Sequence, residues 1–172
     1  MKQLILALTA LIAMCCPSFA HQFEKGALLI VHPWTRATPE GATMGAGYVT
    51  ITNNGKEADK LTGGGFENAD RVEIHEMKMD GDKMTMRKVT DGLEIKPGET
   101  VKFSPGAYHL MFVGLKKPIV QGPNAKGSLT FEKAGTVDID YKVEAIGAMK
   151  SSDADHSGMK MDDPEMKHDH MQ

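Results

Sequence analysis

The chain has 172 residues, of which 41% are hydrophobic and 25% are charged, and its formal net charge is −3 at pH 7. This length fits one hydrophobic core of about 100–150 residues with short attachments. The weakly acidic balance argues against nucleic acid as a partner, because binding it calls for a face rich in Lys and Arg. Methionine is unusually frequent: 11 of the 13 methionines, and all seven histidines, follow residue 20.

Residues 1–20 have the pattern of a Sec-type signal peptide. Lys2 precedes a short apolar run at 4–14, and small residues at 18 and 20 offer a cleavage site after Ala20. The run is shorter than the ~20 residues that span a membrane. Lipid attachment at Cys15 or Cys16 is disfavoured, because neither follows a small residue directly. We therefore expect a periplasmic protein without a membrane span in its mature form.

Cleavage at this position would remove both cysteines. The mature chain of 152 residues would then form neither a disulfide nor a thiolate metal site. A chain of this length can still bury a core without such cross-links.

Short strand patterns separated by Gly, Pro and Asn turns fill the region 21–148, which we take as the folded domain. No stretch keeps a helical period, so the pattern predicts an all-β, antiparallel Greek-key β-sandwich of seven to nine strands. In chain order the expected strands cover 27–34, 47–52, 71–77, 83–89, 100–103, 108–113, 127–131 and 137–143.

The composition changes in the segment 149–172. It has no β-branched or aromatic residue, six acidic residues, three Lys, three His and five Met. Such a segment cannot bury enough apolar surface to offset the entropy of ordering, so we expect a disordered, His/Met-rich tail. Its candidate metal ligands are His156, Met159, Met161, Met166, His168, His170 and Met171.

Two clusters inside the domain combine histidine with methionine. Alternate side chains of a strand point to opposite faces, so His109 and Met111 share one face of the expected strand 108–113. The turn signal Asp-Gly-Asp at 80–82 predicts a hairpin that brings His75 or Met77 close to Met84 or Met86. Four ligands from three strands would make a rigid site.

The ligand type indicates the metal. Thioethers are soft ligands that favour Cu(I), and imidazole accepts copper in either oxidation state. Only the imidazoles compete with protons for the metal, so binding should weaken below pH ~6.5, where free histidine protonates.

At these residues the sequence resembles the PCu(A)C family of periplasmic copper chaperones. His75 is followed after ten residues by Met86, and after 22 more by His109-Leu110-Met111, one residue more than the family spacing. The resemblance covers about residues 24–146 and implies a cupredoxin-like sandwich that binds Cu(I) through these four residues. It also implies delivery to the Cu(A) or another copper centre of cytochrome c oxidase, with the oxidase copper subunit and a Sco-type thiol-disulfide chaperone as partners. We expect a monomer.

The remaining methionines of the hairpin, Met77, Met79 and Met84, match family methionines outside the primary ligand set, so they support the site or one of them replaces Met86. The tail candidates form a hypothetical second copper site that could also take Cu(II).

Other functions stay open at this point. Copper storage or resistance without delivery would use the same site chemistry. An oxidative copper enzyme is the second alternative, because cleavage would place His21 at the N-terminus, where its amine and imidazole could chelate Cu(II). Blue-copper electron transfer needs a cysteine ligand that the mature chain would lack. We expect a protein that is not an enzyme, and a structural role for His32.

Overall fold

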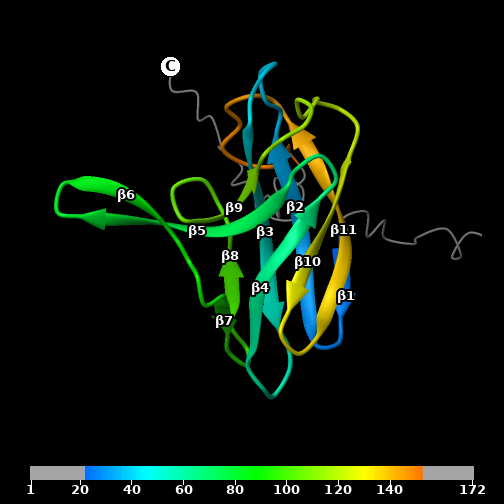
Figure 1. Cartoon of the computed structure of the whole chain (residues 1–172). Coiled ribbons are helices and arrows are strands. Elements are labelled where there is room, and N and C mark those ends of the chain that lie inside the picture. Colours follow the sequence, from blue (N-terminus) through cyan, green and yellow to red (C-terminus); the bar gives the residue numbers. More distant parts are fainter. Residues whose placement is uncertain (1–21, 153–172) are drawn as a thin grey trace, which may run out of the picture.

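The computed structural model describes residues 22–152, and within them the chain forms eleven β-strands and no α-helix (Figure 1). The strands are β1 (Gln22–Lys25), β2 (Leu28–Arg36), β3 (Met44–Asn53), β4 (Asp59–Phe66), β5 (Arg71–Asp80), β6 (Lys83–Lys88), β7 (Leu93–Ile95), β8 (Thr100–Lys102), β9 (Tyr108–Val113), β10 (Ala125–Phe131) and β11 (Gly135–Glu144). The all-β prediction is confirmed, with more strands than the seven to nine expected. These residues contain no helix long and apolar enough to cross a membrane.

Three strands were not predicted, and β4 is the informative one. It carries glycine at 63, 64 and 65, which is unfavourable for a strand. The tertiary structure explains the choice at Gly64, because a Cβ atom there would collide with the backbone carbonyl of Ser128 on β10. Glycine allows the two strands to approach, so a packing requirement overrides the local propensity.

Hydrogen-bonded neighbours in the sheet follow the order β6-β5-β9-β3-β2-β11-β10-β4-β7, and in addition β1 pairs with β2 and β8 pairs with β3. β11 joins the two layers of the sandwich. Its first part pairs with β10, while Lys142–Glu144 pair with Trp34–Arg36 of β2. This β11–β2 pairing is parallel, an exception to the antiparallel arrangement expected from the sequence.

Aromatic and aliphatic side chains fill the space between the layers. Phe66 and Phe112 stack with their ring centroids 4.0 Å apart, and Tyr141 is fully buried with its ring centroid 5.4 Å from that of Phe112. Leu110 on β9 and Ile74 on β5 also point into this core. Because side chains alternate along a strand, His109 and His75 must lie on the opposite, outer face.

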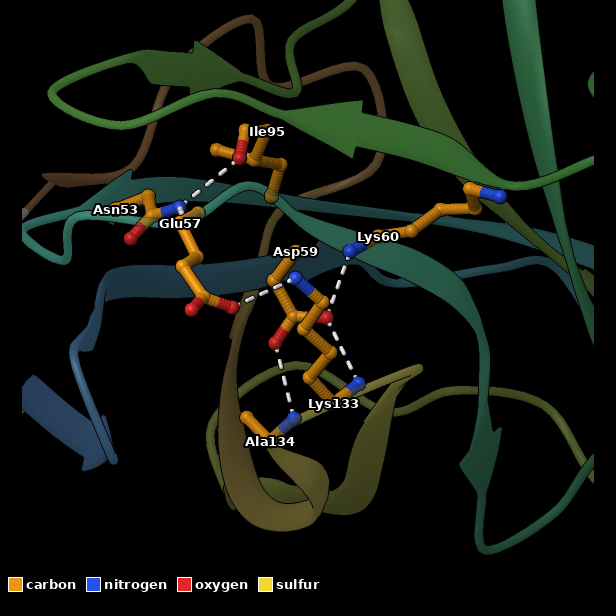
Figure 2. Close-up of polar contacts among 7 residues, drawn as sticks. All are labelled: Asn53, Glu57, Asp59, Lys60, Ile95, Lys133 and Ala134. Carbon is orange, nitrogen blue, oxygen red and sulfur yellow. Dashed lines mark hydrogen bonds and ion pairs between the residues drawn. The ribbon is translucent and has the colours of Figure 1, made fainter.

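A polar network closes the sandwich where β3, β4, β7 and the β10–β11 turn meet (Figure 2). The carboxylate of Asp59 accepts hydrogen bonds from the backbone N–H groups of Lys60 (2.7 Å), Lys133 (2.9 Å) and Ala134 (2.9 Å). Burial alone would raise the pKa of Asp59, but the three N–H donors outweigh it and the pKa is lowered. Nearby, the buried amide of Asn53 donates to the carbonyl of Ile95 at 2.9 Å.

The β5–β6 hairpin reaches outward from the side of the sandwich (Figure 1). The pairing of β5 with β9 ends at Glu76, and beyond this point β5 is paired with β6. Every residue of β6 is exposed. The predicted hairpin therefore forms, and its outer half is a two-stranded ribbon.

Candidate metal centre

His75 and His109 lie opposite each other on the outer face of the sheet. They are cross-strand partners in the antiparallel pairing of β5 with β9. Their ring centroids are 5.7 Å apart, and the rings are tilted by 57°. Strand pairing thus brings together two residues that are 34 positions apart in the sequence, and one ion between the two rings could contact both.

The two predicted methionine ligands occupy diagonal positions around His75. Met111 is the cross-strand partner of Glu73, and Met86 is the partner of Met77. Diagonal neighbours on one face of a sheet lie about 7–8 Å apart, within reach of a long side chain. Met111 is partly buried, whereas Met86 is 51% exposed. The structure therefore places all four predicted ligands on one face, with the two thioethers on either side of the histidine pair.

The His75 ring is held by a carboxylate. Its Nε2 lies 3.0 Å from Oε2 of Glu73, and since the carboxylate can only accept, the ring donates from this nitrogen. Arg71 and Lys88 contact the other oxygen of Glu73 at 2.8 and 3.0 Å. The hydrogen bonds from Arg71, His75 and Lys88 lower the pKa of Glu73 to about 2, so this acceptor stays ionised.

The second ring nitrogen of His75 has a different environment. Nδ1 is buried and, among residues 22–152, has no hydrogen-bond partner. Buried polar atoms are rarely left unpaired, and an exception calls for an explanation. With the proton on Nε2, Nδ1 is unprotonated, and its lone pair can bind a metal ion.

His109 is prepared in the complementary way. Its Nδ1 lies 3.2 Å from the carbonyl oxygen of Ala107, so Nδ1–H donates and Nε2 keeps its lone pair. Burial lowers the pKa of His109, the bond to Ala107 opposes this, and the neighbouring His75 adds to the lowering. The residue is only 6% exposed, and a pKa below the ordinary value of about 6.5 favours the neutral ring at pH 7, the form that metals bind.

The donor set decides which metal fits. Within residues 22–152, no group of three or more His, Cys, Asp and Glu side chains is arranged to hold a metal. The side chains that share this face with the histidine pair include the thioethers of Met86 and Met111, and thioether sulfur suits a soft monovalent ion better than zinc or magnesium.

Glu73 was not among the predicted site residues. The available signal was its spacing of two from His75, which puts the carboxylate and the imidazole on the same face of a strand. Metal-binding histidines commonly donate their second N–H to such a carboxylate, which fixes the tautomer and the ring orientation.

The other predicted candidates lie elsewhere. Met77, Met79 and Met84 continue the same face outward along the hairpin. His32 lies on β2, separated from β9 by β3, at a register shift where its φ is +51°. His21 and the seven tail candidates at 156, 159, 161, 166, 168, 170 and 171 fall outside the described residues, as do the proposed signal peptide and most of the 149–172 segment.

Residues 145–152 extend the described chain across the outer face of β2. Arg36 Nε donates to the carbonyl oxygen of Ala148 at 2.6 Å, and its Nη2 lies 3.4 Å from the sulfur of Met149. Ser152 donates to Glu144 from its backbone N–H at 2.8 Å. Of the segment assigned to the tail by its composition, the first four residues therefore belong to the described structure.

The fold and the outer His/Met face define a cupredoxin-like domain of the PCuAC type. The family model described as "Putative lipoprotein LpqE-like" matches residues 28–143, and the chain belongs to this family. A curated relative, "Putative lipoprotein Lxx21020" from Leifsonia xyli subsp. xyli, is 27% identical over 111 residues, which cover 64% of this chain and 66% of the relative.

Solved structures agree with this assignment. The copper-bound PCuAC domain from PmoF2 is 32% identical with a TM-score of 0.62, and the match covers 73% of this chain and 98% of that domain. The apo form of the PmoF2 domain is 31% identical with a TM-score of 0.64, covering 76% and 100%. The solution structure of Cu(I)-DR1885 from Deinococcus radiodurans is 22% identical with a TM-score of 0.53, covering 73% and 81%, and supports the fold alone.

Proposed function

We propose that this protein is an exported copper chaperone of the cell envelope that holds Cu(I) between His75, His109, Met86 and Met111. One observation carries the proposal: two neighbouring imidazoles each use one nitrogen to donate to a protein acceptor, and the other nitrogen has no partner within residues 22–152. The similarity to a PCuAC domain solved with copper supports the choice of metal.

The ligand atoms follow from the hydrogen bonds. His75 would bind through Nδ1 and His109 through Nε2, because the other nitrogen of each ring is used to donate. The two thioethers complete a neutral set, so a bound Cu(I) leaves one positive charge beside the ionised Glu73. Thioethers need no deprotonation, so protons compete only at the imidazoles.

Release would begin at the exposed side of the site. Met86 is half exposed on the projecting hairpin, whereas His109 is buried. An incoming thiolate from a partner can displace the Met86 thioether first and then the other ligands in turn. The function is therefore binding and ligand exchange rather than catalytic turnover.

We propose a thiol-disulfide chaperone of the Sco type as the exchange partner and the Cu(A) or another copper centre of cytochrome c oxidase as the destination. A strain lacking the protein tests this: reduced oxidase activity in low copper is expected for delivery, whereas copper sensitivity with normal oxidase activity would show storage instead. The His/Met-rich tail is proposed as a second copper site that also accepts Cu(II), and its removal should lower the copper stoichiometry.

The proposal includes export of the protein to the cell envelope. The lipoprotein descriptions of the family and of the Leifsonia relative support an envelope location and reopen lipid attachment at Cys15 or Cys16. The mass of the protein purified from membranes separates the outcomes: an N-terminal diacylglyceryl cysteine shows anchoring, and a chain beginning at His21 shows simple cleavage.

The copper site is tested with the full chain. Anaerobic Cu(I) titration against a chromophoric competitor should show one tight equivalent more for the wild type than for the double variant His75→Ala/His109→Ala. His32→Ala, a histidine change on the same sheet but away from the pair, is the matched control and should bind like the wild type. Equal affinities of the double variant and the wild type would reject the histidine pair as the site.

A further inference from the structure

The outer face of the hairpin continues the metal centre as a double row of methionines. Met77 is the cross-strand partner of Met86, and Met79 is the partner of Met84. Because residues two apart on a strand share a face, all four side chains lie on the same side as His75. We call these four residues the methionine ladder. By its register the ladder leads from the histidine pair towards the tip of the hairpin, and the hairpin projects from the sandwich (Figure 1).

The ladder is not part of the hydrophobic core. Met79, Met84 and Met86 are 55%, 56% and 51% exposed, and only Met77 is partly buried. Methionine in a protein usually fills gaps in a packed interior, where its flexible side chain is an advantage. Three large apolar side chains exposed together on one face of one hairpin have no such role.

Polar contacts on the opposite face of the hairpin and along its backbone link its two strands to each other and to β9. Arg87 pairs with Glu76 at 2.7 Å, and Glu76 also accepts a hydrogen bond from the hydroxyl of Tyr108 at 3.1 Å. Thr85 Oγ1 donates to the carbonyl oxygen of Lys78 at 3.1 Å. These contacts tie the two strands of the ribbon together through its polar face.

The geometry points to a second binding site for a soft monovalent ion, Cu(I), formed by the thioethers of Met77, Met79 and Met84 at the outer part of the ladder. Directly opposed side chains in an antiparallel pair have Cβ atoms about 4.5–5.5 Å apart, and diagonal ones about 7–8 Å. A methionine sulfur lies two bonds beyond Cβ on a freely rotating chain, so sulfurs from both strands can converge on one ion. Thioether-only coordination again selects Cu(I).

This inference rests on the proposed function and extends it. Met86 belongs both to the ladder and to the histidine centre, since it is the partner of Met77 and lies diagonally from His75. An ion held at the outer thioethers can therefore reach the inner site by exchanging one sulfur at a time. The hairpin tip would be the place where copper enters or leaves the protein.

The experiment observes each methionine separately in the full chain. The methionine methyl groups are labelled with carbon-13, assigned by single Met→Leu substitutions, and followed by NMR during titration with Ag(I), an air-stable soft monovalent ion. We expect the Met111 and Met86 methyl signals to shift as the inner site fills, and those of Met79 and Met84 to shift as a separate site fills. Signals from tail methionines are resolved from these by their assignments.

In the double variant Met79→Leu/Met84→Leu, the Met77 methyl signal should no longer report a separate site, while the shift at Met111 should remain. The matched control is Met149→Leu, which changes a methionine that is also exposed, at 69%, but lies off the hairpin. This control should retain both sets. Both variants should give the backbone amide spectrum of a folded chain, because the substituted side chains are exposed.

The two proposals fail separately. If Met79 and Met84 stay unshifted in excess Ag(I) while Met111 saturates, the ladder site is overturned and the inner site stands. If Met79 and Met84 shift while Met111 does not, the inner ligand set is wrong and the outer site stands.

Discussion

The corner around Asp59 and the face around His75 differ in whether their buried polar atoms have hydrogen-bond partners. At the corner, both oxygens of the Asp59 carboxylate accept backbone N–H groups, and the amide of Asn53 is likewise bonded. At the metal face, Nδ1 of His75 is buried and, in the part of the chain described, has no partner. The protein alone supplies the hydrogen-bond partners at the corner, whereas at the metal face one buried nitrogen is left available for the ligand that we propose.

The largest effect is expected from a substitution at the Asp59 corner, which should lower the folding stability and leave the metal face intact. Asp59→Ala leaves three backbone donors without their acceptor, and unsatisfied buried groups cost about 1–3 kcal/mol each. Because water can reach part of this corner after the change, we expect a loss of about 2–4 kcal/mol in the free energy of unfolding, measured by urea denaturation of the copper-free protein. Cu(I) affinity in the absence of urea should not change. A variant as stable as the wild type would show that the network is not structural.

The second effect concerns the carboxylate behind the metal face. Glu73→Gln keeps the shape but weakens the acceptor for His75 Nε2, and losing such an outer partner typically lowers metal affinity roughly 10–100-fold. Competition titration with Cu(I) measures this. Glu76→Gln is the matched control, because Glu76 lies next to His75 on the other face of the same strand. Equal losses in both variants would point to net charge rather than to positioning of the ring.

Acid should affect both regions, but at different pH values. The lowered pKa values of Glu73 and Asp59 mean that these ionised groups stabilise the fold above the unfolded carboxylate range of about 4, and that this stabilisation is lost as the pH falls through their folded values, about 2 for Glu73. The copper-free protein should therefore lose stability progressively below about pH 4.5. Urea midpoints measured from pH 7 to 3 check this, and Asp59→Asn should flatten the curve.

Copper binding should depend on pH at higher pH values than the folding stability does. Burial lowers the pKa of His109, so this ring stays neutral and competent to bind below the value of about 6.5 at which free histidine protonates. The weakening expected from the sequence at that pH should therefore be displaced downward for this ligand. Competition titrations from pH 7.5 to 5 measure the slope, and full loss of binding by pH 6 would contradict the shift.

The smallest effect should come from the polar face of the hairpin. Arg87→Gln removes the contact with Glu76 at 2.7 Å, but exposed ion pairs contribute little. We expect a small decrease in the urea midpoint and unchanged Cu(I) affinity. A large loss of copper binding would show that the two faces of the hairpin are coupled.

Several features of the fold could be predicted because they are local. The alternation in 108–113 correctly placed His109 and Met111 on one face, opposite the buried Leu110 and Phe112, and the turn signal at 80–82 correctly predicted the hairpin. β4 could not be predicted, because its glycines are required by the close approach of β10. The parallel β11–β2 pair and the contact between Glu73 and His75 were likewise missed.

The sequence by itself determined which side chains share a face, since the period of two along a strand is a property of the backbone. Only the tertiary structure decided that β9 lies between β5 and β3, so that His109 is the partner of His75 and Met111 the partner of Glu73. Strand order depends on how the whole core closes, because Leu110, Phe112 and Ile74 must be buried against residues far away in the chain. The histidine pair therefore results from packing on the inner side of the same strands.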